Sequence, residues 1–341
     1  MADFKTASVI IPSYNEEDTI SHCIESLMNG DYPLDKLEFI IADGDSTDNT
    51  LNNIEKFSSE NPDIKIKVVN NPYKTQGYGL NIAIQNVSED SEIIIRADAH
   101  SIYPPNYVAD CAKCLWFSNA DNVGGVMVPL GKGYLQRAVS FCMSHPLGVG
   151  NAKFHMGNRS GFVDTVYLGC FKKDIFGKVG LFDPAMTPNE DAEFNMRIRK
   201  SGGTVYLDSN IRVGYFPRET VAKLMKQYFH YGQGRCRTFK KHGAFTSVRQ
   251  VIPPLWTVLT LIILAMSLLS QLFLLPLLAY FFILLLVSIY GAYKRRDIGV
   301  LLSPICFAVM HYVWGVGFFS ELFRKDRENE QRNGTKGQLY S

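Results

Sequence analysis

Three short acidic clusters contain the side chains of this chain that are best suited to chemistry. They are Asp43-Gly44-Asp45-Ser46-Thr47-Asp48, Asp98-Ala99-His100 and Glu190-Asp191. Carboxylates can hold a divalent cation, accept hydrogen bonds from a base or a ribose, or remove a proton from a hydroxyl group. Each cluster alone also has a purely structural interpretation, as a turn, a helix cap or the acidic start of a helix over residues 192–200. Their occurrence together, in this order, favours one shared site.

Alternating strands and helices are predicted to position these clusters. Apolar, β-branched runs predict strands over residues 8–12, 37–42, 64–69 and 92–95, with helical patterns between them over 20–27, 47–59 and 78–87. This alternation is typical of an α/β fold with a mostly parallel, doubly wound, Rossmann-like sheet. Ligands bind beyond the carboxyl ends of the strands in such sheets. The rule points to residues 12–16, 43–48 and 96–100.

The C-terminal part of the chain has the composition of a membrane anchor. No charged residue lies between Gln250 and Tyr293, and a second charge-free run extends from Ile298 to Ser320. As one helix the first run would be about 66 Å long, whereas a bilayer core is ~30 Å thick. We therefore expect two crossings with a break near residues 270–271 or 276, and a cytoplasmic loop at the basic residues 294–296. The alternative is a buried helical hairpin in a soluble core.

The segments around this anchor suggest how the chain is divided. The N-terminus has no signal-peptide pattern, so we expect the soluble part to face the cytoplasm from the inner membrane. Residues 220–250 contain seven Lys or Arg and no acidic residue, which is typical of a surface that faces anionic membrane lipids. A third crossing would place the basic residues 324–327 outside, against the positive-inside rule, unless Pro304 allows a re-entrant or interfacial segment. The predicted parts are a catalytic domain over 1–217, a basic amphipathic segment over 218–250, two or three transmembrane helices within 251–323 and a charged tail over 324–341.

The order of the motifs resembles the family-2 glycosyltransferases with a GT-A fold, over about residues 5–235. The matching segments are Pro12-Ser13-Tyr14-Asn15-Glu16, Ile41-Ala42-Asp43-Gly44-Asp45-Ser46-Thr47-Asp48, Asp98 and Asn189-Glu190-Asp191. Within that family the chain looks like the bacterial succinoglycan-type exopolysaccharide glucosyltransferases. Those enzymes also carry an Arg-x-Asp-Ala-His segment, here residues 96–100, and an apolar C-terminal region with a His-x-x-Trp-Gly-like segment, here residues 311–315.

The resemblance implies a role for each motif. It makes Asp191, with Glu190 beside it, the catalytic general base, and it places the uracil and ribose of a UDP-sugar donor at residues 12–16 and Asp43. Residues 227–231 look like a degenerate form of the Gln-x-x-Arg-Trp motif of cellulose and hyaluronan synthases. Apart from the resemblance, the charges of Arg235 and Arg237 make them candidates for the donor diphosphate or, equally, for lipid headgroups. The predicted nucleotide-sugar-binding residues are Pro12, Tyr14, Asn15, Glu16, Asp43, Asp45, Arg96, Asp98, Gln227 and Arg235.

The predicted metal site departs from the pattern common in this family. Arg96 takes the place of the first Asp of Asp-x-Asp, so one carboxylate is lost. Asp98-Ala99-His100 itself reads as Asp-x-His, the form that the polypeptide N-acetylgalactosaminyltransferases use to bind manganese. In an extended segment Asp98 and His100 can face one cation, and an imidazole ligand favours Mn²⁺ over Mg²⁺. In the alternative, His100 only bonds a neighbouring loop and Asp98 alone holds the ion.

The chemistry predicted for this site is a single displacement. A nucleoside diphosphate is a good leaving group once a metal and nearby cations neutralise its charge. One base that aligns the acceptor hydroxyl behind the anomeric carbon gives inversion, and Asp191 is the carboxylate assigned to that task. The resemblance makes glucose from UDP-glucose the expected sugar, in surface or exopolysaccharide biosynthesis. The membrane region suggests a polyprenyl-diphosphate-linked saccharide as acceptor, and we expect no nucleic-acid partner.

Four alternative interpretations can be compared with specific sequence features. A processive polysaccharide synthase is disfavoured by the degenerate motif at residues 227–231 and by the small number of crossings. Arg96 keeps open an inactive nucleotide-sugar-binding partner, although such a protein has no use for a base at Asp191. No Gly-x-Gly-x-x-Gly follows the first strand, which argues against a Rossmann oxidoreductase. Cys111 and Cys114 form a lone Cys-x-x-Cys, better interpreted as one helix face than as a zinc site.

Overall fold

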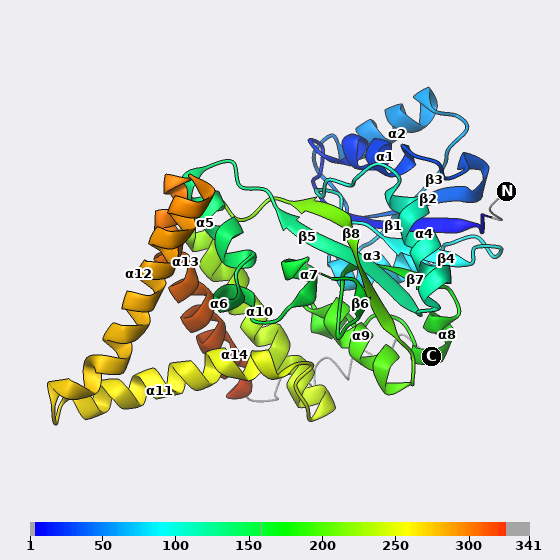
Figure 1. The fold of residues 1–341 in the computed structure, drawn as a ribbon. Helices are drawn as coiled ribbons and strands as arrows, with labels where there is room; N and C mark the ends of the chain where they lie inside the picture. The colour runs from blue at the N-terminus through cyan, green and yellow to red at the C-terminus, as the bar shows by residue number, and fades with distance from the viewer. Residues whose placement is uncertain (1–3, 158, 325–341) are drawn as a thin grey trace.

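The computed structural model describes residues 4–157 and 159–324, and within them the chain forms one eight-stranded sheet (Figure 1). The strand order is β3-β2-β1-β4-β7-β5-β8-β6. Strands β1 to β4 are parallel, β7 is antiparallel to both its neighbours, and β5 and β8 are parallel to each other. The strands are β1 (Ala7–Ser13), β2 (Leu37–Asp43), β3 (Lys65–Asn70), β4 (Ile93–Arg96), β5 (Asn122–Pro129), β6 (Gly161–Phe162), β7 (Tyr167–Lys172) and β8 (Val205–Tyr215). This confirms the predicted mostly parallel α/β sheet.

Helices cover both faces of the sheet, which explains why its central strands are mostly apolar and why even their polar residues, such as Ser8 and Glu38, are buried. On one face pack α1 (Ile20–Met28), α2 (Thr50–Glu60) and α4 (Tyr107–Ser118). On the other pack α3 (Gln76–Gln85), α8 (Ile175–Val179) and α9 (Glu190–Lys200). Cys111 and Cys114 lie on α4, as expected for a helix face.

The strand register brings the predicted loops to one edge of the sheet. Ser13 pairs with Asp43, and Asp43 in turn pairs with Asn70, so β1, β2 and β3 end at the same level. On the other side of β1, Ile10 pairs with Arg96 at the end of β4. The first two acidic clusters therefore follow adjacent strands, as the rule for parallel sheets predicts.

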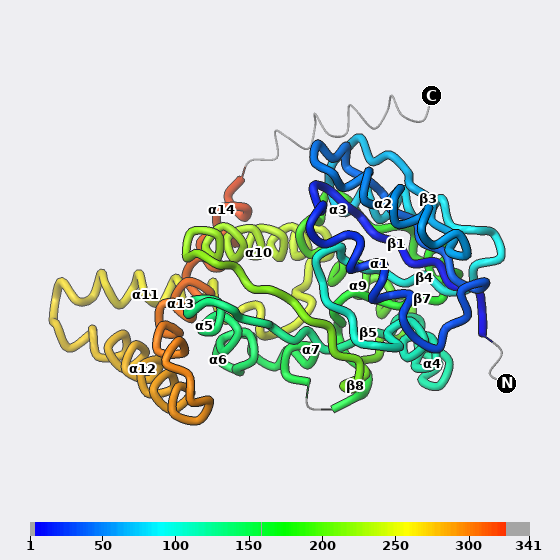
Figure 2. The backbone as a smooth tube through the Cα atoms, turned by 90° about the horizontal axis from the view of Figure 1, so that it is seen from above, coloured from blue at the N-terminus to red at the C-terminus, as the bar shows by residue number. Residues whose placement is uncertain are grey.

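The C-terminal helices form a second part of the molecule, and α11 and α12 project away from the sheet in both views (Figures 1 and 2). Three stretches among the described residues are long and apolar enough to cross a membrane: Val248–Ser267, Gln271–Arg295 and Ile298–Leu322. The break between the first two, at residues 268–270, lies beside the first of the two predicted positions, 270–271, whereas the second, Pro276, lies inside the second stretch. The helices are α10 (Val221–His242), α11 (Ile252–Ser267), α12 (Leu275–Arg295), α13 (Ser303–Ala308) and α14 (Trp314–Leu322).

Close backbone contact joins α10 to α14, and glycine makes it possible. A Cβ at Gly232 would lie 2.0 Å from the carbonyl oxygen of Trp314, and one at Gly317 would lie 2.1 Å from that of Phe229. Neither position can carry a side chain without moving the helices apart. The predicted basic segment over 218–250 is therefore built into the helical part through α10. The predicted domain boundaries stay predictions, and the predicted tail lies outside the described residues except for Arg324.

Candidate active site

The loops after β1 and β2 hold each other through a dense set of hydrogen bonds. The backbone N–H of Asn15 donates to Ser46 Oγ at 2.9 Å, and Asn15 Oδ1 accepts from the N–H of Thr47 at 2.8 Å. Buried Asp43 accepts from the N–H and the hydroxyl of Ser46, at 2.9 and 2.6 Å. The structure thus places predicted residues of both loops side by side, around a buried carboxylate.

Exposed groups flank this pair of loops. Tyr14 is 46% exposed, and the ammonium of Lys74 lies 5.8 Å from the centre of its ring. Lys74 also pairs with Asp45 at 2.9 Å, where Asp45 adopts a left-handed backbone conformation with φ 63°. Tyr14, Asp45 and Lys74 therefore form an open rim of exposed side chains that contact one another.

The loop after β4 is tied to the loop after β1 through His100. Nδ1 of His100 lies 2.9 Å from Glu16 Oε1, and this bond raises the pKa of the imidazole. A carboxylate oxygen can only accept, so Nδ1 carries the proton and Nε2 is left as the nitrogen that can bind a cation. Histidine ligands of metals are commonly oriented by such a carboxylate on their other nitrogen.

Arg96 links the remaining acidic residues into one chain of contacts. Its guanidinium lies 3.5 Å from Asp98 Oδ1 and 3.2 Å from Glu190 Oε1. The side chain is buried, which disfavours its charge, but the carboxylates of Asp98, Glu190 and Asp191 outweigh burial and raise the pKa of Arg96. Burial raises the pKa of Glu190, while Arg96 opposes that rise. Arg96 therefore acts as a fixed internal cation between β4 and α9.

Asp191 stands in the first turn of α9 and is only half-buried, unlike Glu190. Its Oδ1 accepts from the N–H of Ala192 at 2.7 Å. Before it, Asn189 has φ 97° and donates through Nδ2 to the carbonyl oxygen of Tyr231 at 3.3 Å. A Cβ at Gly234 would lie 2.2 Å from Pro188 O, so α10 lies directly against the start of α9. Of the two predicted catalytic carboxylates, Asp191 is the accessible one.

The predicted residues of α10 lie on the Asp191 side of the site. Gln227 donates to the hydroxyls of Tyr215 and Tyr231, at 2.9 and 3.0 Å. Arg235 reaches Thr246 Oγ1 at 3.4 Å. Arg237 donates to the carbonyl oxygen of Thr187 at 2.8 Å and pairs with Glu321 of α14 at 3.4 Å. Arg237 thus connects the segment before α9 to the helical part of the molecule.

Comparison with known proteins agrees with this geometry. Residues 8–172 match the model of the family described as Glycosyl transferase family 2. The chain carries a family-2 glycosyltransferase domain. It is 29% identical to the succinoglycan biosynthesis protein ExoA of Rhizobium meliloti, over 92% of this chain and 94% of that protein. It is 28% identical to a dolichyl N-acetyl-α-D-glucosaminyl phosphate 3-β-D-2,3-diacetamido-2,3-dideoxy-β-D-glucuronosyltransferase of Methanococcus voltae, over 93% of this chain and 97% of that one.

Solved structures of glycosyltransferases share the fold. A mannosyltransferase of Pyrobaculum calidifontis, solved with GDP-Man and Mn²⁺, superposes with a TM-score of 0.64 at 18% identity, over 94% of this chain and 88% of that one. TarS 1–349 of S. aureus, solved with UDP-GlcNAc, gives 0.51 at 19% identity, over 69% and 66%. The fold is therefore GT-A. The family match and the two named relatives show that the protein is a glycosyltransferase.

Two residues at the centre of this glycosyltransferase site escaped the sequence analysis. Gln76, at the start of α3, donates to Asp98 Oδ1 at 3.1 Å. Arg218 is exposed, and its charge affects the pKa of both His100 and Tyr231. Gln76 follows the third strand, so the rule about carboxyl ends of strands extends to it. Arg218 follows β8, far along the chain, and no local signal marks it.

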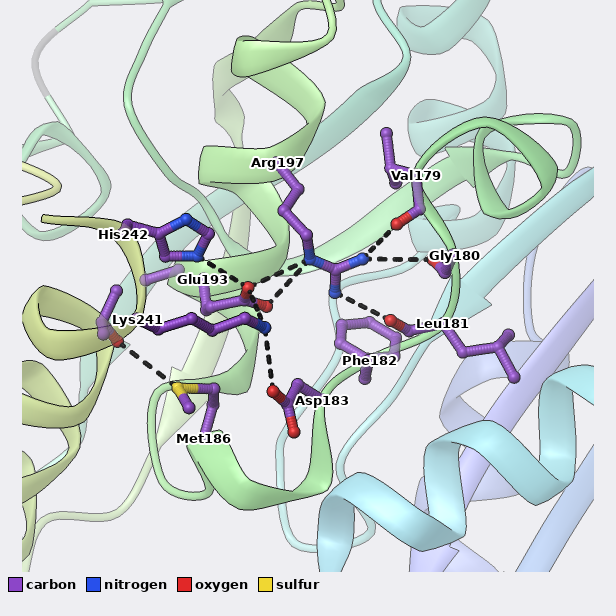
Figure 3. A network of polar contacts seen from close by, with 12 residues as sticks. Val179, Gly180, Leu181, Phe182, Asp183, Met186, Glu193, Arg197, Lys241 and His242 are labelled. Atoms are coloured by element: carbon purple, nitrogen blue, oxygen red, sulfur yellow. Dashed lines mark hydrogen bonds and ion pairs between the residues drawn. The ribbon is translucent and has the colours of Figure 1, made fainter. Parts of the chain in front are cut away.

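A buried network fixes α9 against α10 behind the site (Figure 3). Glu193, fully buried, accepts from Lys241 Nζ at 2.7 Å and from His242 Nε2 at 2.9 Å. Arg197 completes the network with a bond from Nε to Glu193 at 3.0 Å and one to the carbonyl oxygen of Leu181 at 2.7 Å. Burial would raise the pKa of Glu193, but the hydrogen bonds from Lys241 and His242 and the charge of Arg197 together lower it. The helix that carries Asp191 is thus held by charge pairs that the interior makes costly to break.

Proposed function

We propose that this glycosyltransferase moves a sugar, by default glucose from UDP-glucose, onto a polyprenyl-diphosphate-linked saccharide with inversion. The observation that carries the proposal is the chain of contacts from Asp98 through Arg96 to Glu190, the neighbour of Asp191. These contacts connect the expected position of the donor diphosphate, at the strand ends, with the start of α9, where Asp191 is the accessible one of the two predicted catalytic carboxylates. The names of the two relatives, one in succinoglycan synthesis and one acting on a dolichyl-phosphate sugar, support a lipid-linked acceptor.

Each part of the site has a role in this proposal. Residues 12–16 and Asp43 bind the uracil and the ribose, while Asp45 and Tyr14 line the open rim. Asp191 takes the proton of the acceptor hydroxyl as the bond to the anomeric carbon forms and the bond to the diphosphate breaks. Arg96 and Arg218 supply fixed positive charge near the leaving group.

A donor screen tests this proposal. The purified full-length protein in uncharged detergent is supplied with UDP-glucose, UDP-galactose, UDP-N-acetylglucosamine or GDP-mannose, with and without a polyprenyl-diphosphate-linked saccharide. We expect UDP release from one UDP-sugar, and much faster release with the acceptor. Release from GDP-mannose alone, or none from any donor, would reject the proposed donor class.

A divalent cation fits the residues at the strand ends, although no three His, Cys, Asp or Glu side chains gather into a ready-made cation site among the described residues. Asp98 and His100 supply two ligands, which leaves the remaining positions for the donor diphosphate and water. Glu16 holds Nδ1 of His100, so that Nε2 is presented in the correct tautomer. The cation would neutralise charge on the departing diphosphate.

Changing His100 tests the metal assignment. We expect chelated wild-type protein to be inactive and Mn²⁺ to restore it better than Mg²⁺, because nitrogen ligands suit the transition metal. His100→Ala should weaken Mn²⁺ binding in the presence of UDP by at least ~10-fold, the range for disturbing a ligand or its support, as measured by electron paramagnetic resonance. His22→Ala, at an exposed histidine, is the matched control. Equal Mn²⁺ affinity in wild type and His100→Ala would show that His100 is not a ligand.

The membrane topology that we propose places both ends of the third apolar stretch on the catalytic side. At its start, Asp297 pairs with Arg137 of α5 (Tyr134–Met143) at 3.1 Å. At its end, the backbone carbonyl of Glu321 accepts from Lys240 of α10 at 2.8 Å. The stretch therefore lies along α10 as an interfacial or re-entrant segment, while residues 248–295 cross twice. The positive-inside rule is then satisfied at both basic loops.

Reporter fusions test the topology. A green fluorescent protein fused after Ser341 should fluoresce, and alkaline phosphatase at the same position should be inactive, since both would be cytoplasmic. Fusions after Ser270, between the first two apolar stretches, should give the opposite pattern. Active phosphatase after Ser341 would demonstrate a third crossing.

A further inference from the structure

Two cationic side chains, Arg235 and Arg249, lie close to Asp191, because the charges of Asp191 and Arg249 both act on Arg235. Arg235 follows Tyr231 by one helical turn, so both residues point to the same side of α10. That side contacts the start of α9, because Tyr231 O accepts from Asn189 and Gly234 touches Pro188. Arg235 is thereby placed next to the proposed base.

Arg235 is poorly satisfied for a side chain in this position. It is half-buried, its hydrogen bond to Thr246 is long at 3.4 Å, and no carboxylate of the described residues comes within ion-pair distance. Burial lowers the pKa of Arg235, and the positive charge of Arg249 also lowers it, while Asp191 opposes this. A guanidinium has five N–H donors, and the hydrogen bond found for Arg235 is the long one to Thr246. Its remaining donors suit it to bind an oxyanion of a ligand.

Arg249 connects this group to the membrane. It lies in the first turn of the first apolar stretch, Val248–Ser267, and we therefore expect it at the membrane surface, at the level of the lipid phosphates. It donates to Asp164 at 2.8 Å and to Asn151 at 3.3 Å. A Cβ at Gly150 would lie 3.1 Å from its side chain.

The segment that holds Arg249 is itself anchored in the apolar helices. It includes α6 (Pro146–Val149) and α7 (Lys153–Met156). The carbonyl oxygen of Leu147 lies 2.7 Å from Nε2 of His311, in the third apolar stretch. A cationic path therefore leads from the membrane surface at Arg249 to Arg235 and Asp191.

We propose that Arg235, with Arg249, forms a binding site for the phosphate groups of the lipid-linked acceptor. The site rests on the proposed function, and it explains how a membrane-bound acceptor brings its hydroxyl to Asp191. Arg235 makes charge-assisted, bidentate contacts to the phosphate. Arg249 supplies the second cation at the membrane surface, and the apolar chain continues along the membrane helices.

Three alternative roles of Arg235 make different demands on the structure. A donor-diphosphate role would require it at the strand ends, where Arg218 and Arg96 already act on His100 and Asp98. General attraction to anionic headgroups requires only exposed cations, such as Lys223 and Lys226 on α10. If Arg235 only stabilises the negative charge of Asp191, it does not need to bind a phosphate group. Each alternative role predicts a different pattern of ligand binding in variants of Arg235.

The experiment uses the full-length protein in uncharged detergent, with farnesyl diphosphate and farnesol as probes in calorimetry. We expect wild type to bind farnesyl diphosphate at least ~10-fold more tightly than farnesol, as for charge-assisted hydrogen bonds. Arg235→Gln should remove most of this difference, and Arg235→Lys should restore part of it. The affinity for UDP should be unchanged in both variants.

Lys226→Gln is the matched control, because Lys226 carries the same charge on the opposite side of α10. It should leave the binding of farnesyl diphosphate unchanged. Equal loss in Lys226→Gln and Arg235→Gln, or displacement of the probe by phosphatidylglycerol vesicles at equal phosphate concentration, would indicate a general headgroup surface and overturn the proposal. Loss of UDP affinity in Arg235→Gln would assign Arg235 to the donor site and overturn the proposal. Unchanged binding of farnesyl diphosphate by Arg235→Gln would also overturn it, because the remaining role of Arg235 would be to stabilise the charge of Asp191. Failure of the wild type to bind UDP would instead count against the proposed function.

Discussion

Asp191→Asn is expected to lower the turnover number by at least ~100-fold while donor binding stays close to normal. An amide cannot accept the proton of the acceptor hydroxyl, so the attacking oxygen loses its base. The local structure should survive, because the amide oxygen can still accept from the N–H of Ala192, as Asp191 Oδ1 does at 2.7 Å. The measurement is acceptor-dependent UDP release at saturating donor, together with UDP affinity by calorimetry.

Asp174→Asn provides the control for this loss, since Asp174 is an exposed carboxylate that pairs only with Lys178 of the same helix among the ion pairs of the described residues. It should retain the turnover of the wild type. A turnover of Asp191→Asn within a few-fold of the wild type would remove Asp191 as the base, and Glu190, buried against Arg96, offers no accessible replacement.

Asp43→Ala is expected to weaken UDP binding by more than tenfold. A carboxylate that accepts a hydrogen bond from the uracil N3–H contributes ~1.5–3 kcal/mol, and about 1.4 kcal/mol corresponds to tenfold in affinity. The structure adds a complication, because Asp43 also accepts two bonds from Ser46 and so shapes its own loop. Calorimetric titration with UDP measures the loss.

Ser46→Ala separates these two contributions. It removes the hydroxyl bond to Asp43 and the bond that Ser46 Oγ accepts from the N–H of Asn15, but it leaves the carboxylate and the bond from the Ser46 N–H in place, so UDP affinity should fall by only a few-fold. If Ser46→Ala weakens UDP binding as much as Asp43→Ala does, the carboxylate acts through loop shape and makes no contact with the base. Unchanged UDP affinity in Asp43→Ala would remove Asp43 from the donor site.

Most of the sheet could be predicted because its strands and its ligand loops are local features. The runs before Pro12, Asp43 and Arg96 are mostly apolar, since helices cover both faces of the sheet, and each ends in a polar turn. The predicted limits differ from those of β1 to β4 by no more than one residue at either end. The length of the charge-free run after Gln250 likewise predicted two apolar stretches, and the break lies beside the first of the two positions predicted for it.

The contacts that organise the site could not be predicted, because they join residues far apart in the chain. The sequence marks Arg96 as the position of a lost carboxylate and as a predicted nucleotide-sugar-binding residue, whereas the structure shows it as a cation that bridges Asp98 and Glu190. The bond between His100 and Glu16 spans more than eighty residues of sequence. The position of α10 depends on glycines at 232 and 234 that fit against α14 and α9, and periodicity alone does not reveal such fits.

The anomeric configuration of the product is the sharpest test of single displacement at Asp191. After reaction of an α-linked UDP-sugar with the lipid-linked acceptor, nuclear magnetic resonance of the isolated saccharide reports the new linkage. A single base at Asp191, acting opposite the leaving diphosphate, predicts a β-linkage formed only in the presence of the active carboxylate. An α-linked product, or a β-linked product formed equally well by Asp191→Asn, would contradict this mechanism.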